Sequence, residues 1–184
     1  MCEQCRLKPI YVFTNKRQVC ARCFINYFQK KFLYTIRKFK MLNRNDIVLC
    51  ENKKQDFRKV VLKYLLKTFS ERSSIKITNL KTKANSTKKA IATTTDLAAY
   101  EIILSTINKN SRDFSKMLPV VKKTIKPLYL FLDKEVLLYA QLKKLKFEKQ
   151  QIKKTDKIVK FIDELEKKHP EIKRAIVSGF LKLC

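Results

Sequence analysis

Apolar residues recur along much of the chain at the three- and four-residue spacing of an amphipathic helix. In residues 24–40 the apolar positions are Phe24, Tyr27, Phe28, Phe32, Ile36 and Phe39, with basic residues between them. This spacing predicts a helix with one buried face and one cationic face. Similar spacing predicts helices over 56–69, 96–107, 134–145 and 156–168, the last of which ends at His169-Pro170.

Short apolar or alternating runs between these segments predict β-strands. The predicted strands are Ile47–Cys50, Ile75–Thr78, Ala90–Thr93 and Leu128–Leu132. The polar stretch 79–89 predicts a loop, and Pro119 and Pro127 bracket a connection. Because strands alternate with helices, we expect an α/β fold with a mainly parallel sheet. We expect this domain to span residues 41–184, after a zinc knuckle and basic amphipathic helix in residues 1–40.

Two close cysteine pairs lie at the N-terminal end, Cys2-x-x-Cys5 and Cys20-x-x-Cys23. Zinc prefers four soft ligands in a tetrahedron, and each pair can present two sulfurs from one tight turn. We therefore expect a structural zinc site on these four residues, with an iron–sulfur site or a redox pair as alternatives. Cys50 and Cys184 are left over, and Cys50 ends a predicted strand, which favours a buried thiol.

Charge changes the picture most. The chain has 43 Lys and Arg against 16 Asp and Glu, a formal net charge of +27. Such an excess favours a polyanionic partner such as tRNA, rRNA, DNA or an acidic membrane surface. The alternative is that most of these charges are only solvated.

No segment of the sequence has the length and apolar character of a secretory leader or a membrane span. We therefore predict no membrane partner and a cytoplasmic location. In that compartment thiols stay reduced, so the paired cysteines are interpreted as metal ligands rather than disulfides.

Glycine is nearly absent, since Gly179 is the only one. Loops that hold phosphates usually need glycine, because only then can backbone N–H groups approach the anion closely. Neither a Walker loop nor a dinucleotide fingerprint can be placed on this chain. This absence predicts that ATP does not bind.

Several stretches together resemble the cytosolic tRNA 2-thiolation family, PP-loop ATPases that convert the wobble uridine to 2-thiouridine. The specific ones are the knuckle running into Cys20-Ala21-Arg22-Cys23-Phe24, and Ile125-Lys126-Pro127-Leu128 with the segment after it. Ala92-Thr93 before a helix and His169-Pro170 add weaker matches. The resemblance implies a reduced PP-loop domain behind the knuckle.

The departures from the family pattern concern the parts that do chemistry. The family's Ser-Gly-Gly-x-Asp-Ser loop is replaced by Cys50–Asp56, and the acidic pair expected after the Ala-Thr strand is missing from Thr94–Ala99. The expected central cysteines are absent from 79–89, and Lys149 and Gln150 stand where another cysteine is expected. From the resemblance we predict a pseudoenzyme, with no catalytic residue and no bound ATP.

On this hypothesis the chain is a noncatalytic subunit of a tRNA-thiolating complex that docks a catalytic paralogue and tRNA. The alternative is a zinc-ribbon RNA-binding protein that belongs to ribosomes or another RNA particle. In both cases basic residues near the knuckle and first helix would contact phosphates. Tyr11, Phe13 and Tyr34 could stack on unpaired bases or pack in the core. The predicted RNA contacts are Arg6, Lys8, Lys16, Arg17, Arg22, Lys30, Lys31, Arg37 and Lys38.

Overall fold

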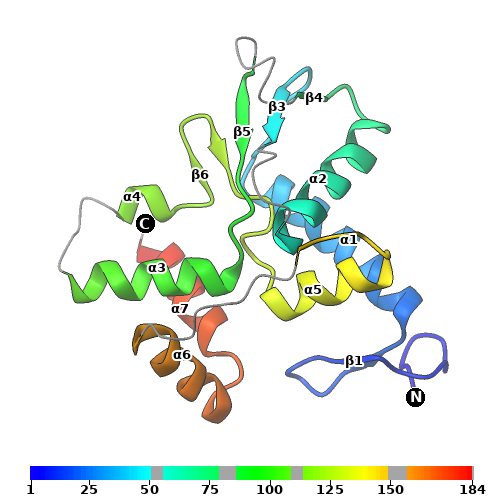
Figure 1. Cartoon of the computed structure of the whole chain (residues 1–184), viewed down its shortest axis with the longest axis vertical. Coiled ribbons are helices and arrows are strands. Elements are labelled where there is room, and N and C mark those ends of the chain that lie inside the picture. Colours follow the sequence, from blue (N-terminus) through cyan, green and yellow to red (C-terminus); the bar gives the residue numbers. More distant parts are fainter. Residues whose placement is uncertain (51–55, 79–85, 109–113, 149–156, 184) are drawn as a thin grey trace.

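The computed structural model describes residues 1–50, 56–78, 86–108, 114–148 and 157–183. It contains a five-stranded sheet with the strand order β4-β3-β5-β7-β6, drawn in the upper part of Figure 1. All neighbouring pairs are parallel except β7 and β6, which form an antiparallel hairpin. The prediction of an α/β fold with a mainly parallel sheet is therefore confirmed. The strands are β3 (Ile47–Cys50), β4 (Lys76–Thr78), β5 (Lys88–Ala90), β6 (Val120–Val121) and β7 (Thr124–Ile125).

Three helices pack with this sheet around one apolar core. They are α1 (Ala21–Lys38), α2 (Phe57–Ser70) and α5 (Asp133–Leu142). The Phe28 ring stacks on Tyr139 with centroids 4.2 Å apart and lies 4.4 Å from Phe131. These contacts explain the apolar spacing of α1, since its buried face carries the rings that reach α5. The division into two parts at residue 40 stays a prediction. Residues of α1, before that boundary, share one core with residues of α2 and α5, after it.

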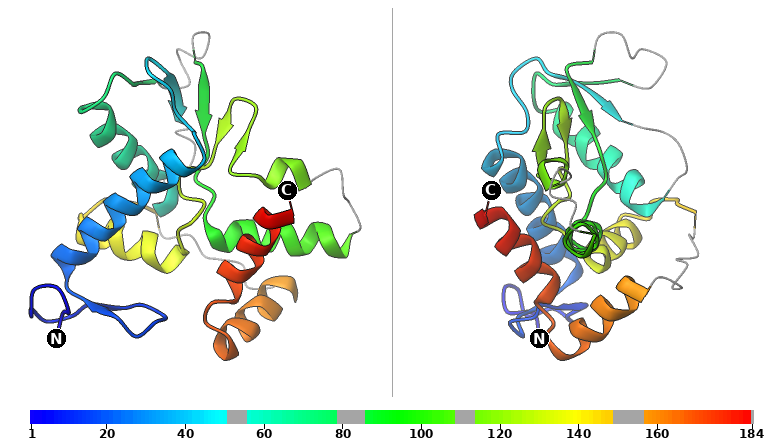
Figure 2. Two further views of the ribbon diagram at one scale, coloured as in Figure 1. Left: turned by 180° about the vertical axis from the view of Figure 1, so that it is seen from behind. Right: turned by 90° about the vertical axis from the view of Figure 1, so that its left-hand side faces the viewer.

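A smaller apolar cluster lies among α3 (Thr95–Ile107), α4 (Phe114–Met117) and α7 (Ile172–Leu183). Helix α6 (Lys157–Lys168) packs on α3 and α7. Seen from behind, α3, α6 and α7 lie together, apart from α1 and α5 (Figure 2). The sequence analysis did not predict α4 or α7. No helix among the described residues combines the length and apolar character that a bilayer crossing requires.

The N-terminal segment forms a small antiparallel hairpin in front of α1. Its strands are β1 (Tyr11–Val12) and β2 (Gln18–Val19), with Tyr11 opposite Val19. Val19 is fully buried, and the Tyr11 ring lies 5.0 Å from Phe24 of α1. The hairpin is therefore fixed to the start of the helix by aromatic packing.

Two of the strand predictions need correction. Leu128–Leu132 is not a strand. It is a buried irregular segment held by turn hydrogen bonds, in which the N–H of Tyr129 donates to the Lys126 carbonyl at 3.0 Å. The other strand lies at Lys88–Ala90 rather than at 90–93, so the loop prediction is wrong at Lys88 and Lys89; residues 79–85 lie outside the described residues.

Candidate functional site

Four thiols meet where the N-terminal segment joins α1. Their Sγ atoms all lie within 4.8 Å of one another. The Sγ of Cys5 is 3.6 Å from those of Cys2 and Cys23 and 3.3 Å from that of Cys20. Cys20 is the N-cap of α1 and Cys23 lies in its first turn. The structure thus brings together the four residues that the sequence predicted as metal ligands, and they form a group able to hold a metal ion.

Local backbone geometry presents these thiols to one point. The Arg6 N–H donates to the Cys2 carbonyl at 2.9 Å, and Arg6 itself has a positive φ of 59°, which closes the first turn tightly. Burial raises the pKa of the Cys2 thiol, but hydrogen bonds from the backbone N–H groups of Cys20, Gln4 and Cys5 outweigh it and lower that pKa to about 6. The thiolate, the form that binds metals, is therefore favoured at Cys2.

Most of the predicted RNA contacts lie on the surface, with two exceptions. Arg17 is half-buried, with its guanidinium 4.8 Å from the centre of the Phe13 ring. Lys31 is also half-buried, with its Nζ 2.8 Å from a Glu135 oxygen. The side chains of these two residues are thus used inside the protein. The exposed members are Arg6, Lys8, Lys16, Arg22, Lys30, Arg37 and Lys38.

The aromatic residues considered for base stacking divide in the same way. Tyr11 and Phe13 are half-buried and pack against each other with centroids 5.0 Å apart. Tyr34 on α1 is 56% exposed, and the Nζ of Lys38 lies 5.7 Å from its ring centre. Tyr34 is thus the one of the three whose ring faces solvent.

The carboxyl edge of the sheet holds a cluster of charged residues that the sequence analysis missed. The chain leaves β3 through α2 to β4 on one side, and leaves β5 through α3 toward β7 on the other. In open α/β sheets ligands bind at such a switch point, outside the carboxyl ends of the strands. Residues 51–55, which follow β3, lie outside the described residues.

Arg58 is at the centre of this carboxyl-edge cluster. Its Nε donates to an Asp133 oxygen at 2.7 Å, a second donor contacts the other Asp133 oxygen, and a third lies 3.1 Å from Asp56. Burial lowers the pKa of Arg58, but the Asp133 and Asp56 carboxylates raise it above its usual range. The other oxygen of Asp56, Oδ1, is buried and has no partner among the described residues.

Thr94 and Asp96, just after β5, complete the cluster. The Thr94 hydroxyl donates to Asp133 at 2.6 Å, and the Asp133 N–H donates to Asp96 at 2.7 Å. Burial and the Asp133 charge raise the pKa of Asp96, while Lys173 of α7 lies 2.9 Å from it. Two acidic side chains, Asp96 and Asp133, thus lie close together beyond β5, where the family pattern has an acidic pair, but Asp133 comes from α5. Local sequence alone could not indicate this pairing, because the two residues lie far apart along the chain.

Glu135 is a second internal anchor that the sequence did not indicate. Its side chain is fully buried, and its oxygens lie 2.8 Å from Lys31 and 3.0 Å from Arg174. It also accepts a hydrogen bond from the Leu132 N–H and so caps the start of α5. One carboxylate therefore connects α1, α5 and α7.

Comparison with solved structures identifies the fold. The chain is similar to the U34-tRNA thiolase NcsA from Methanococcus maripaludis, solved with its [4Fe-4S] cluster. The TM-score is 0.79 at 20% sequence identity, covering 99% of this chain and 86% of that chain. The fold is that of a tRNA thiolase. No protein-family model and no curated protein matches the sequence.

This thiolase fold corrects the prediction that the chain is a pseudoenzyme without a nucleotide loop or catalytic cysteines. That prediction is wrong, because a protein that is itself a thiolase has the same fold over nearly the whole chain. Of the stretches used for the prediction, Cys50–Asp56, 79–89 and 149–150 lie largely outside the described residues, whereas Thr94–Ala99 is described at the start of α3. The statement that no ATP binds stays an untested prediction.

The structure bears on one part of the glycine argument, the backbone conformation that a tight loop requires. Several residues other than glycine adopt the left-handed backbone conformation that glycine usually supplies. All are basic except Asn45, so this chain makes tight turns with Lys and Arg instead. A shortage of glycine is therefore weak grounds for excluding a tight loop here. The residues are Arg6, Lys16, Lys40, Asn45, Lys122 and Lys144.

Proposed function

We propose that this chain binds tRNA and acts in the 2-thiolation of the wobble uridine, in the cytoplasm. The observation that carries the proposal is the shared fold with a U34-tRNA thiolase across 99% of the chain. The net charge of +27 supports it, because the substrate would be a polyanion. The fold alone would fit many chemistries, so the charge is the necessary second support.

The surface proposed to meet tRNA runs along α1 from the cysteine cluster. Arg22, Lys30 and Arg37 are exposed; Lys30 and Arg37 are seven residues apart, close to two whole turns, and Arg22 lies about 80° around the helix from Lys30, so the three share one broad side of it. Arg6 and Lys8 extend this surface onto the knuckle. Contacts from such residues release counterions from the phosphates, so tRNA binding would weaken steeply with added salt.

We further infer that the four cysteines hold zinc. A tetrahedral Zn–S distance of about 2.3 Å places the sulfurs about 3.8 Å apart. The separations of 3.3 and 3.6 Å suit such a single ion, whereas an iron–sulfur cluster binds its thiolates on different irons and spreads them. With four protein ligands the ion has no open position, so its role would be structural.

Metal analysis tests the zinc proposal directly. We expect the purified chain to contain zinc in a one-to-one ratio and no iron. Cys20→Ser should lose the metal, whereas Cys50→Ser should keep it, since Cys50 is buried at the end of β3. Iron with visible absorption from the same four cysteines would overturn the assignment.

A second thiolase-fold chain is the proposed protein partner, as the family resemblance implies. One surface suits such a contact, because Leu7, Ile10 and Val12 in the N-terminal segment are all exposed apolar side chains. Affinity purification followed by mass spectrometry of bound protein and RNA would test this proposal. Recovery of a thiolase-fold protein with tRNA supports it. Recovery of ribosomal subunits would favour the alternative of a ribosome-associated RNA-binding protein.

Removal of the chain from its own cells tests the function as a whole. We expect the 2-thiouridine content of bulk tRNA, measured by nucleoside mass spectrometry, to fall and to be restored by the wild-type chain. Thiolation by the purified chain with ATP and a sulfur donor, with and without its partner, shows whether it acts alone. Unchanged 2-thiouridine in cells that lack the chain would contradict the proposal.

A further inference from the structure

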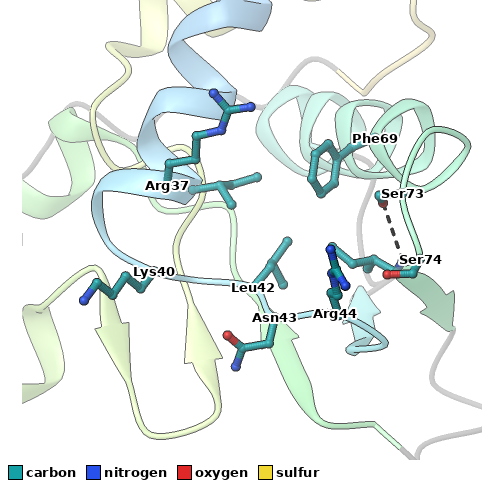
Figure 3. A pocket seen from close by; sticks show the side chains of 10 residues that line it. Arg37, Lys40, Leu42, Asn43, Arg44, Phe69, Ser73 and Ser74 are labelled. Carbon is teal, nitrogen blue, oxygen red and sulfur yellow. Dashed lines mark hydrogen bonds between the residues drawn. The ribbon is translucent and has the colours of Figure 1, made fainter.

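A pocket at the opposite edge of the sheet, outside the amino ends of β3 and β4, has a different character from the carboxyl edge. It lies between the end of α1, the segment leading into β3 and the turn from α2 to β4, and has a volume of about 590 Å³. Figure 3 shows Leu42 near its centre, with the Phe69 side chain projecting from α2 toward it. Both side chains are half-buried, so the pocket has an apolar floor.

Three cations surround this amino-edge pocket. Arg37 and Arg44 lie on two sides of Leu42, with Lys40 on a third (Figure 3). All three are exposed, and no carboxylate is among the described residues that line the pocket. The nearby Asp46 is buried, and its two oxygens accept hydrogen bonds from the Asn43 N–H and the Thr87 hydroxyl. The cationic rim is thus not neutralised from within the pocket.

The backbone at Lys40 is in a conformation that usually requires glycine. Lys40 has φ 46° and follows the last turn of α1. The Met41 N–H donates to the Ile36 carbonyl at 3.0 Å and the Lys40 N–H to the Arg37 carbonyl at 3.1 Å, a Schellman ending. The Cβ of a side chain makes this left-handed backbone conformation less favourable, so glycine at position 40 would give a more stable fold.

We propose that this pocket binds an RNA phosphate on Arg37, Lys40 and Arg44, with an adjoining unpaired base against Phe69. The inference rests on the proposed tRNA function and identifies a second contact region for it. Guanidinium groups recognise phosphates well, and bases stack on aromatic side chains irrespective of sequence. Asn43 supplies an amide at the rim for base-edge hydrogen bonding.

Continuity with the rest of the basic surface supports RNA as the occupant. Arg37 belongs both to the pocket and to the exposed face of α1 that leads back to the cysteine cluster. Phe69 also lines a second, smaller pocket between α1 and α2, of about 140 Å³, whose lining includes the exposed Arg72. A polynucleotide can follow such a path, whereas a small anion would use only one part of it.

The competing explanation is that these cations only stabilise the carboxyl ends of α1 and α2, where helix dipoles favour positive charge. A matched pair of variants separates the two. Lys40→Gly and Lys144→Gly each remove one lysine at the same Schellman position after a helix, since Lys144 has φ 51° after α5. Both changes relax the backbone, so both variants should fold.

The test measures binding of a tRNA transcript with U34 in its anticodon loop, as a function of salt. We expect Lys40→Gly to weaken binding about threefold to tenfold and to lower the salt slope by about one, and Arg44→Gln to do the same. Lys144→Gly should leave both quantities close to those of the wild type. Equal effects of Lys40→Gly and Lys144→Gly would overturn the pocket proposal.

The aromatic contact has its own matched pair. Phe69→Leu keeps an apolar floor but removes the ring, and we expect about a fivefold loss of affinity for the same transcript. Phe57→Leu, at the other end of α2, is the control and should bind normally. If the wild-type chain binds no tRNA, the proposed function itself fails. If it binds and all pocket variants match their controls, only the pocket inference fails.

Discussion

The two edges of the central sheet use the same basic residue types in opposite ways. At the carboxyl edge Arg58 and Lys173 are buried against carboxylates of Asp133 and Asp96. At the amino edge the cations of the pocket are exposed and no described lining residue is acidic. The acids thus gather where they support the fold. The excess positive charge of the chain, +27 in all, is therefore felt more strongly at the amino edge, because carboxylates neutralise the cations of the carboxyl edge and no described lining residue neutralises those of the pocket.

The largest expected effect comes from removing the internal anchor Glu135. Glu135→Ala leaves Lys31 and Arg174 without their buried counter-charge, and we expect a loss of about 3–5 kcal/mol in the free energy of unfolding. Urea denaturation measures it. Glu171→Ala is the control, since its side chain is 50% exposed in its pair with Arg174 and should contribute less than about 1 kcal/mol. Equal losses of unfolding free energy for the two variants would mean that the buried ion pairs of Glu135 stabilise the fold no more than the exposed pair of Glu171.

Titration of Cys50, at the carboxyl end of β3, tests how well that edge excludes water. Burial raises the pKa of its thiol from 9.0 to about 11. Between those values the unfolded chain has lost the proton and the folded chain keeps it. The contribution to stability is therefore complete below pH 9 and declines as the pH rises through 11, by roughly 3 kcal/mol in all.

The measurement for Cys50 is the difference in unfolding free energy between the wild type and Cys50→Ala across this pH range. We expect the wild type to lose unfolding free energy relative to Cys50→Ala as the pH rises from 9 to 11. Taking the difference cancels the titration of the tyrosines and lysines common to both proteins. A pH-independent difference would show that water reaches the thiol.

Replacing the lysines with left-handed backbone by glycine should raise the free energy of unfolding, by less than the losses predicted above. Lys40→Gly and Lys144→Gly each relieve a positive φ, and we expect each to stabilise the fold by about 1 kcal/mol. Thermal and urea unfolding measure the change. Lys38→Gly, inside the last turn of α1, is the contrasting change and should destabilise by about 1 kcal/mol. A destabilised Lys40→Gly would mean that the lysine side chain itself holds the turn.

The smallest effect on stability is expected at the amino edge. Arg44→Gln should change the free energy of unfolding by less than about 0.5 kcal/mol, because the side chain is exposed and pairs with no described carboxylate. The same variant is expected to weaken RNA binding. Circular dichroism under denaturant, compared with RNA binding at matched salt, checks both parts. A large loss of stability would make Arg44 a structural residue.

Local pattern predicted those features that depend on neighbouring residues. The spacing of Phe24, Phe28 and Phe32 indicated α1, and Ile47–Cys50 was correctly predicted as β3. The four cysteines came together as their spacing indicated. These signals succeed because side chains three or four apart on a helix, or three apart on a tight turn, meet without help from the rest of the fold. The two cysteine pairs then meet through the β1–β2 hairpin that lies between them.

Features that depend on distant residues could not be found in this way. Asp133 meets Thr94 and Arg58 only because α5 returns to the carboxyl ends of β3 and β5. Leu128–Leu132 has the apolar character of a strand, but tertiary packing buries it as an irregular segment. The single glycine of the sequence also gave no sign of where the left-handed backbone lies, because the fold tolerates lysine at positive φ. In each case a long-range contact or backbone strain outweighed local preference.

Helix α1 has a further consequence as a spacer. With 18 residues it is about 27 Å long, and Phe24, Phe28 and Phe32 bury one side of it in the core. Its length and direction are therefore fixed, with the thiol cluster at one end and the cationic pocket at the other. An RNA that touches both ends must itself present phosphates at that separation, so the protein would choose among RNAs by their shape rather than by their base sequence.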